Sequence, residues 1–214
     1  MRIVIYDLDR TLTQRPTFTP FLAFAAARLA PWRLALLPAW MAMMIGHKLG
    51  LCDRTTLKRR GMRLMLGRPD PTRLGAVAAE FAGGRARLLH PGAERAVALD
   101  RQDGCTLVIA TAAYALYAAP FGELLAVDHV IGSPWDGEPH AGPNCYGPEK
   151  LARVKAWFDT LGIARSDADI RAVSDSFSDA PLLDWADEAW FVTSSARAAQ
   201  RARARGWLPV DFSS

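Results

Sequence analysis

Residues 3–13 read IVIYDLDRTLT, and this stretch decides how the rest of the chain is interpreted. It begins as a run of β-branched and aromatic residues, which is typical of a strand buried on both faces. Asp7 and Asp9 follow that run at once. Two carboxylates this close repel each other, so the pair is costly unless something makes use of it. The stretch therefore predicts a central strand whose carboxyl end carries a functional site.

Further apolar segments of the same character alternate with helical patterns along the chain. The strand-like segments are residues 105–111, 127–133, 169–175 and 188–194. The helical patterns are residues 92–101, 114–126, 148–161 and 195–205. Strands that alternate with helices predict an α/β fold with a doubly wound, parallel, Rossmann-like sheet.

Residues 16–90 interrupt this alternation, because they show helical apolar patterns and no convincing strand. We expect them to form an inserted α-helical cap, with the core domain made of residues 1–15 and 91–214. Within the cap, residues 34–46 are uncharged, but they number only 13 and include Pro38. A membrane-spanning helix needs about 20 apolar residues. A buried helical hairpin or an amphipathic element at a membrane surface fits this segment better.

The charge is distributed unevenly along the chain. The net charge is +4, yet residues 28–68 hold nine Lys or Arg and a single acid, Asp53. Such a segment indicates either an ordinary solvated basic face or an anionic partner, for which a membrane surface or phosphate groups are favoured over nucleic acid. No cleavable apolar leader precedes the first strand, so we expect a cytoplasmic protein, peripheral at the inner face of the membrane if the cap contacts lipid.

Polar residues fall where the predicted strands end, which is where open α/β sheets bind ligands. Thr111 ends the second strand, Lys150 opens a helix, and Asp175 and Asp179 follow a later strand. The Gly- and Pro-rich residues 133–149 predict a loop or short hairpin that helps to frame the site. Converging carboxylates favour Mg²⁺ with oxygen ligands, and no cluster of His and Cys points to zinc.

A cation together with a lysine and a hydroxyl indicates a site for a phosphoryl group. Asp7 would be the nucleophile that forms an aspartyl-phosphate. Asp9 would be the general acid and base, with its backbone carbonyl facing the metal. Thr111 would hydrogen-bond the phosphoryl group and Lys150 would neutralise it.

Each of these residues also has an ordinary structural interpretation. Asp9 could be a turn former, and Thr111 could simply end a strand. Lys150 could be a surface charge, and Asp175 or Asp179 could cap a helix. Their joint occurrence at successive strand ends favours the functional interpretation.

These residues resemble the motifs of the haloacid dehalogenase superfamily of phosphohydrolases. The four motifs would be DLDRT at residues 7–11, VIAT at 108–111, the lysine of YGPEK at 146–150, and SDSFSD at 174–179. The resemblance implies a haloacid dehalogenase-like fold, Mg²⁺ bound by Asp7, Asp9 and Asp175 with Asp179 in support, and phosphate bound by Thr111 and Lys150. The position of the cap is similar to the phosphoserine-phosphatase-like branch.

Within that branch the chain looks most similar to the phosphatidylglycerophosphate phosphatases of the C type. The resemblance implies a lipid phosphomonoester substrate, and an apolar, basic cap agrees with it. The apolar side chains considered for lipid contact are Trp32, Trp40, Met41, Met43 and Met44, which could equally form the core of the cap. Three alternatives stay open: a phosphatase of a small soluble phosphomonoester such as phosphoserine, a receiver-like phosphorylatable signalling module, and a non-enzymatic binder that uses the basic segment.

Overall fold

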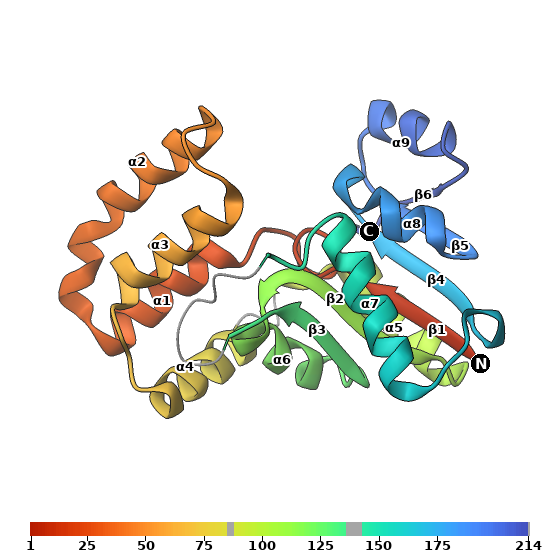
Figure 1. Cartoon of the computed structure of the whole chain (residues 1–214), viewed down its shortest axis with the longest axis horizontal. Helices are drawn as coiled ribbons and strands as arrows, with labels where there is room; N and C mark the ends of the chain where they lie inside the picture. Colours follow the sequence, from red (N-terminus) through yellow and green to blue (C-terminus); the bar gives the residue numbers. More distant parts are fainter. Residues whose placement is uncertain (85–87, 136–142, 214) are drawn as a thin grey trace.

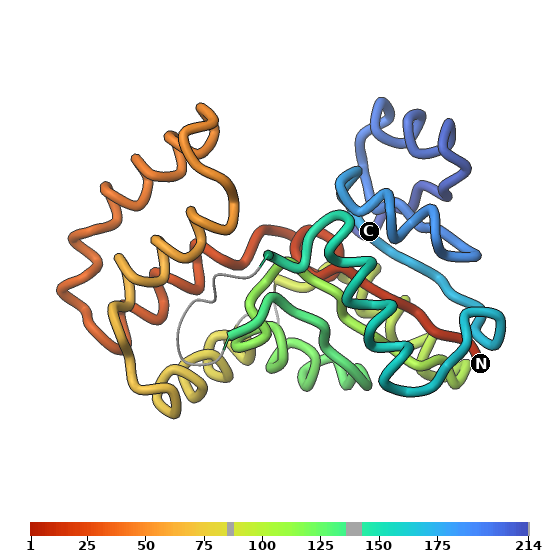
Figure 2. Tube along the Cα trace, viewed as in Figure 1, coloured from red at the N-terminus to blue at the C-terminus, as the bar shows by residue number. Residues whose placement is uncertain are grey.

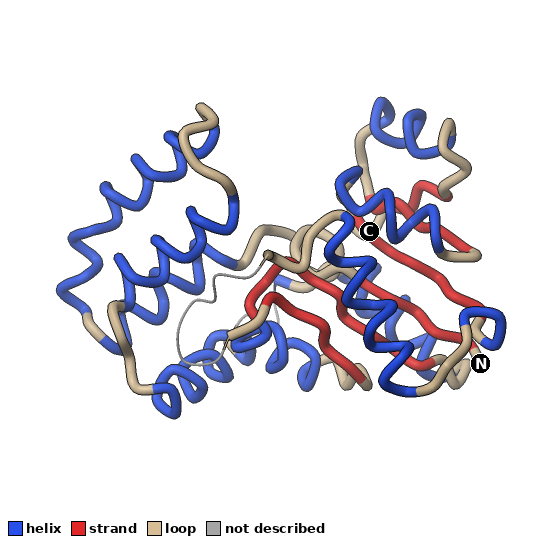
Figure 3. The backbone as a smooth tube through the Cα atoms, viewed as in Figure 1, coloured by secondary structure: helices blue, strands red, loops and turns tan. Residues whose placement is uncertain are grey.

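The structure is a computed structural model that describes residues 1–84, 88–135 and 143–213. Its centre is a six-stranded sheet in which all neighbouring strands are parallel, in the order β3-β2-β1-β4-β5-β6. The strands are β1 (Arg2–Tyr6), β2 (Thr106–Tyr114), β3 (His129–Ser133), β4 (Asp169–Ser174), β5 (Glu188–Val192) and β6 (Leu208–Val210). The predicted doubly wound parallel sheet is confirmed (Figure 3).

Helices cover both faces of the sheet (Figure 1). The helices on one face are α5 (Pro91–Gln102) and α6 (Ala115–Leu124), and those on the other are α7 (Pro148–Leu161), α8 (Ala180–Trp185) and α9 (Ala196–Arg203). Because side chains alternate along a strand, Val4 and Tyr6 of β1 pack toward α5 and α6, whereas Ile3 and Ile5 pack toward α7 and α8. The continuous apolar run therefore fills two cores.

The short elements β6 and α8 were not predicted from the sequence. Strand β6 adds three residues to the sheet edge beside β5, and it contains Pro209, which only an edge strand tolerates well. Helix α8 covers six residues directly after the last motif. Both are too short to show a clear hydrophobic period in the sequence.

The inserted segment is helical, as expected. Between residues 16 and 90 the described chain forms α1 (Phe18–Leu29), the 3-10 helix η1 (Pro31–Leu36), α2 (Leu37–Lys48), α3 (Arg54–Leu66) and α4 (Pro71–Gly83), and it adds no strand to the sheet. Helices α1 to α3 stand away from the sheet, whereas α4 packs against α6 of the core (Figures 1 and 2). Phe21 of α1 and Phe81 of α4 both contact Tyr117 of α6, so an aromatic cluster anchors the base of the insertion.

The apolar residues of the basic segment divide into two groups. Trp40 of α2 is buried and lies so close to α3 that a Cβ on Gly61 would come within 2.6 Å of its ring. Trp32 and Met41 are 65% and 51% exposed, so the interpretation as buried cap core is wrong for these two. Among the described residues, no helix combines the length and apolar character that crossing a bilayer requires.

Candidate active site

Asp7 and Asp175 follow the neighbouring strands β1 and β4, at the point where the strand order reverses. The chain builds the sheet outward from β1 through β2 to β3, then returns to the other side of β1 to add β4. The backbone N–H of Asp7 donates to the Val173 carbonyl of β4 at 2.9 Å, which fixes the loop after β1 beside the loop after β4. Ligands of doubly wound sheets bind at this switch point.

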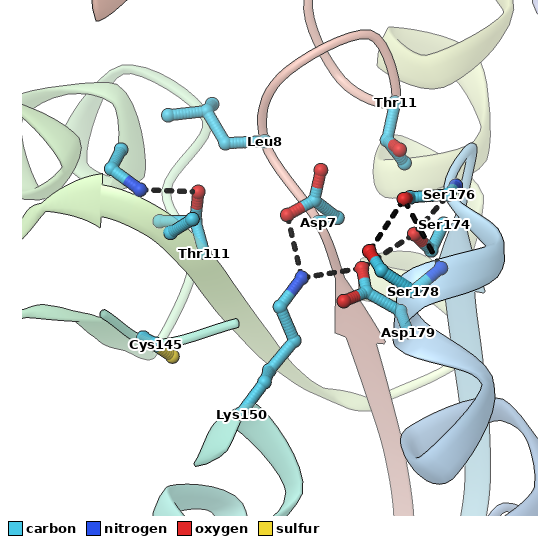
Figure 4. A network of polar contacts seen from close by, with 12 residues as sticks. Asp7, Leu8, Thr11, Thr111, Cys145, Lys150, Ser174, Ser176, Ser178 and Asp179 are labelled. Atoms are coloured by element: carbon cyan, nitrogen blue, oxygen red, sulfur yellow. Dashed lines mark hydrogen bonds and ion pairs between the residues drawn. The ribbon is translucent and has the colours of Figure 1, made fainter. Parts of the chain in front are cut away.

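Lys150 joins the two loops (Figure 4). It lies in the first turn of α7, after Gly147 at a φ of +58°, where glycine has the least steric cost. Its ammonium donates to Asp7 Oδ1 at 2.7 Å and to Asp179 Oδ2 at 2.6 Å. Lys150 is 1% exposed, so the interpretation as a surface charge is wrong.

Burial dominates the electrostatics of the carboxylates. It raises the pKa of Asp7 to about 7, with Asp179 and Asp9 adding repulsion and Lys150 opposing the rise. It also raises the pKa of Asp175 to about 6, and the nearby Arg10 opposes that rise. Conversely, the two carboxylates raise the pKa of Lys150 against the effect of its burial. The site therefore holds more negative charge than its own lysine neutralises.

Asp9 and Thr111 approach the site from its other side. The carboxylate of Asp9 accepts hydrogen bonds from the backbone N–H of Thr17 at 2.8 Å and from its hydroxyl at 2.7 Å. Thr17 is the residue that precedes α1, so the predicted acid and base is bonded to the start of the cap. The hydroxyl oxygen of Thr111 accepts from the N–H of Ala113 at 3.1 Å.

All six predicted site residues line a single cavity of about 250 Å³. They are Asp7, Asp9, Thr111, Lys150, Asp175 and Asp179. The helix-cap interpretation fails for Asp179, because α8 begins after it but its side chain makes no capping hydrogen bond. Instead, its Oδ2 also accepts from Ser174 Oγ at 2.7 Å. Part of the predicted loop at residues 133–149, residues 136–142, lies outside the described residues.

Several residues around the cavity had no assigned role in the sequence prediction. The hydroxyl of Thr11 accepts from the N–H of Asp175 at 3.0 Å and so ties the first motif to the fourth. Thr11 is the last residue of the DLDRT motif, and this position could have indicated a role at the site. Arg54 of α3 lies 4.6 Å over the ring of Tyr146, and both residues line the cavity. Nothing in the local sequence distinguishes Arg54 from the other basic residues of the cap.

The oxygen atoms of the site fit a hard cation only in part. Among the described residues, no three His, Cys, Asp or Glu side chains converge closely enough to hold a metal ion by themselves. Two features do fit: desolvation raises the pKa of the Asp7 and Asp175 carboxylates, and Asp179 Oδ1 is buried with no hydrogen-bond donor among the described residues. A cation here would need backbone or water oxygens in addition to carboxylates, which is usual for Mg²⁺.

Comparison with known protein families identifies the class to which the chain belongs. The family model of haloacid dehalogenase-like hydrolases matches residues 4–184, so the chain belongs to that family. The predictions of the superfamily and of a hydrolytic enzyme are thereby confirmed.

Individual proteins that resemble the chain have low sequence identity to it. Over 198 residues the chain is 31% identical to the Protein CicA of Caulobacter vibrioides, a match that covers 87% of this chain and 83% of CicA. A protein of unknown function from Bordetella pertussis Tohama I has a TM-score of 0.88 at 24% identity, with 99% and 98% of the two chains covered. A substrate-bound phosphoserine phosphatase has a TM-score of 0.60 at 14% identity over 97% and 91%. These two solved structures show the fold.

Proposed function

We propose that this protein is a Mg²⁺-dependent phosphomonoesterase that works through an aspartyl-phosphate on Asp7. The observation that carries the proposal is the position of Asp7 at the sheet switch point, bonded to a buried lysine in a cavity that Asp9 and Asp175 also line. A dianionic phosphoryl group is a chemically suitable ligand for such a site, because it accepts hydrogen bonds from lysine and threonine together.

In the first step, the Asp7 carboxylate oxygen attacks phosphorus and the bond from phosphorus to the ester oxygen breaks. Asp9 donates a proton to the departing oxygen, which leaves as an alcohol. In the second step, the Asp9 carboxylate takes a proton from water while the water oxygen attacks phosphorus. Inorganic phosphate leaves and the Asp7 carboxylate is restored.

Lys150 and Thr111 keep the phosphoryl group in place through both steps. The ammonium of Lys150 lies 2.7 Å from Asp7 Oδ1, where it limits the rise in the pKa of Asp7 that burial causes and so favours the reactive, ionised form of the nucleophile. The carboxylates of Asp7 and Asp175 and the backbone carbonyl of Asp9 would hold the metal, with Asp179 in support. Bound Mg²⁺ supplies positive charge that offsets repulsion between the carboxylates and the phosphoryl oxygens.

The test is turnover of p-nitrophenyl phosphate by the purified chain. Activity should require Mg²⁺, should be lost in EDTA, and should return when Mg²⁺ is added in excess. Asp7→Asn is the control for contaminating phosphatases. Turnover that is unchanged in EDTA or in Asp7→Asn would contradict the proposal.

For the substrate, we propose a phospholipid monoester of the phosphatidylglycerophosphate kind, handled by a protein that is cytoplasmic and peripheral at the inner membrane face. Support comes from Met41, Ile45 and Leu49, which follow one another at helical spacing along α2 and its C-terminal end and are 51%, 58% and 72% exposed. The exposed Lys48 lies in the same segment, and a cation beside an apolar stripe favours an anionic bilayer surface.

The test of the substrate is to assay one preparation with phosphatidylglycerophosphate in detergent and, in parallel, with phosphoserine. This comparison distinguishes a lipid phosphomonoester from a small soluble one. The lipid should have the higher kcat/KM. A preference for phosphoserine would remove the lipid proposal and leave the phosphatase proposal intact.

A further inference from the structure

A second cavity, of about 410 Å³, opens beside the first. The two share Asp9, Pro16, Arg54, Ala112 and Tyr146 in their walls. The remaining walls are mostly apolar and come from α1, α2, α3, the end of β2 and the start of α6. They include Phe18, Trp40, Met44, Leu57, Ala113 and Tyr117. A phosphomonoester whose phosphoryl group lies at Asp7 would place its leaving group in this second cavity.

One cation is buried in the wall of the second cavity. Lys58 of α3 is 5% exposed, and its ammonium donates to the Ala112 carbonyl at 2.5 Å and to Asn144 Oδ1 at 2.9 Å. It also lies 4.1 Å from the ring centre of Tyr114. In the described part of the chain, no carboxylate forms an ion pair with Lys58.

No ion pair within the described residues compensates this charge, although Asp9 attracts it from a distance. Burial, with repulsion from Arg54, lowers the pKa of Lys58 to about 7. An ammonium has three N–H donors, and two of them are used by Ala112 and Asn144. The third is available to a molecule that enters the cavity.

A second unused polar group lines the same cavity. The hydroxyl of Tyr117 is fully buried and makes no hydrogen bond of good geometry within the described residues, although Thr17 lies near enough to interact with it. Thr17, the hydroxyl residue on that side, donates its own proton to Asp9. A buried hydroxyl without a well-formed hydrogen bond is unfavourable, so an acceptor on the bound ligand would improve its bonding.

We propose that Lys58 and Tyr117 determine substrate specificity by binding an anionic group on an otherwise apolar leaving group. The substrate class is thus a phosphomonoester whose organic part is apolar and carries its own negative charge, paired with Lys58. This inference rests on the proposed phosphatase function. The apolar walls bind the body of the leaving group, and the two polar groups bind its charge.

The alternative is that Lys58 only fastens α3 to the segment after Thr111, through Ala112 and Asn144. That role would affect every substrate equally, because it acts on the phosphate-binding segment. A role in specificity affects only substrates that carry the charge. The two roles are separated by a pair of substrates that differ in this one feature.

Phenyl phosphate and 4-carboxyphenyl phosphate form such a pair. Wild type should have the higher kcat/KM for the carboxylated ester. Lys58→Met should lower kcat/KM for that ester about 10- to 100-fold more than for phenyl phosphate, as expected for the loss of a charged hydrogen bond. Tyr117→Phe keeps the ring and should produce a smaller selective loss, about 3- to 10-fold. Arg60→Met is the matched control, because Arg60 is an exposed cation on the same helix that lines neither cavity.

Equal losses for both esters in Lys58→Met, or no preference in wild type, would overturn the inference while leaving the phosphatase function standing. If Lys58→Met does not fold, Tyr117→Phe decides by the same ratio. Absence of phenyl phosphate turnover by wild type would instead refute the proposed function itself.

Discussion

Replacing Lys150 with Met should lower the free energy of unfolding by about 3–5 kcal/mol at pH 8. Lys150 contacts Asp7 at 2.7 Å and Asp179 at 2.6 Å, and its side chain is 2% exposed. At these separations each pair attracts by about 6 kcal/mol for an effective dielectric constant of about 20. Much of that gain offsets the desolvation of the lysine, which the variant no longer has to bury. The net loss of stability in the variant is therefore the cost of burying the carboxylates of Asp7 and Asp179 without a cation beside them.

The cost should depend on pH in a defined direction. The folded-state pKa of Asp7 is raised to about 7 and that of Asp175 to about 6, both above the usual value of 3.8. Groups shifted upward contribute stability that is complete below about pH 4 and is lost as the pH rises through the folded-state pKa. Because Lys150 opposes the shift of Asp7, removing it extends this loss to higher pH. At pH 5 the variant should therefore lose only about 1–2 kcal/mol.

Urea unfolding in EDTA at pH 5 and pH 8 measures both values. Lys155→Met is the control, because Lys155 is exposed on the same helix. A loss below about 1 kcal/mol at pH 8, or a loss of the same size at both pH values, would refute the reasoning that an uncompensated buried charge is the cause.

Three further predictions concern the chemistry and the packing. Asp7→Asn should lower kcat for p-nitrophenyl phosphate at least about 10³-fold, measured by p-nitrophenolate release, and residual activity above that level would exclude Asp7 as nucleophile. Asp9→Asn should lower kcat about 10²- to 10⁴-fold. Turnover at the wild-type rate would exclude Asp9 as the general acid and base. Gly61→Ala should lower stability by about 1–3 kcal/mol in thermal unfolding, because the new methyl would lie 2.6 Å from the Trp40 ring; an unchanged melting temperature would contradict this packing.

The sheet could be predicted because its signals are local. A buried parallel strand is a short apolar run, and five of the six strands are at least five residues long. A helix boundary could also be predicted where the sequence contains a residue that terminates helices. Gly162 ends α7 in the left-handed conformation, with a φ of 64°. Strand β6 lacks such a signal, since its pairing with β5 depends on the tertiary fold and not on its three residues.

The site was predictable for a topological reason. Carboxyl ends of parallel strands meet at one edge of the sheet, so the residues that follow the predicted strands were expected at one edge. That β1 and β4 are neighbours, which brings the loops at Asp7 and Asp175 together, is a finding of the structure. The side-chain orientations could not be predicted. The carboxylate of Asp9 bonds to Thr17 at the start of the cap, a contact that depends on how the chain leaves the core. Lys58 resembles its basic neighbours in sequence, and only the packing of α3 against the core shows that it is buried.

The two cavities have opposite electrostatic requirements. At the end of the sheet, the buried Asp7 and Asp179 and the half-buried Asp175 outnumber the single Lys150. Under the cap, Lys58 gives a buried positive charge with no carboxylate paired to it in the described chain. A bound cation can neutralise the carboxylates of the first cavity, and an anionic leaving group can neutralise Lys58 in the second. The first cavity therefore favours the metal ion, and the second favours the charged part of the substrate. Because Asp9 lines both cavities and is bonded to the start of the cap, its carboxylate is the group through which occupancy of the second cavity would affect proton transfer in the first.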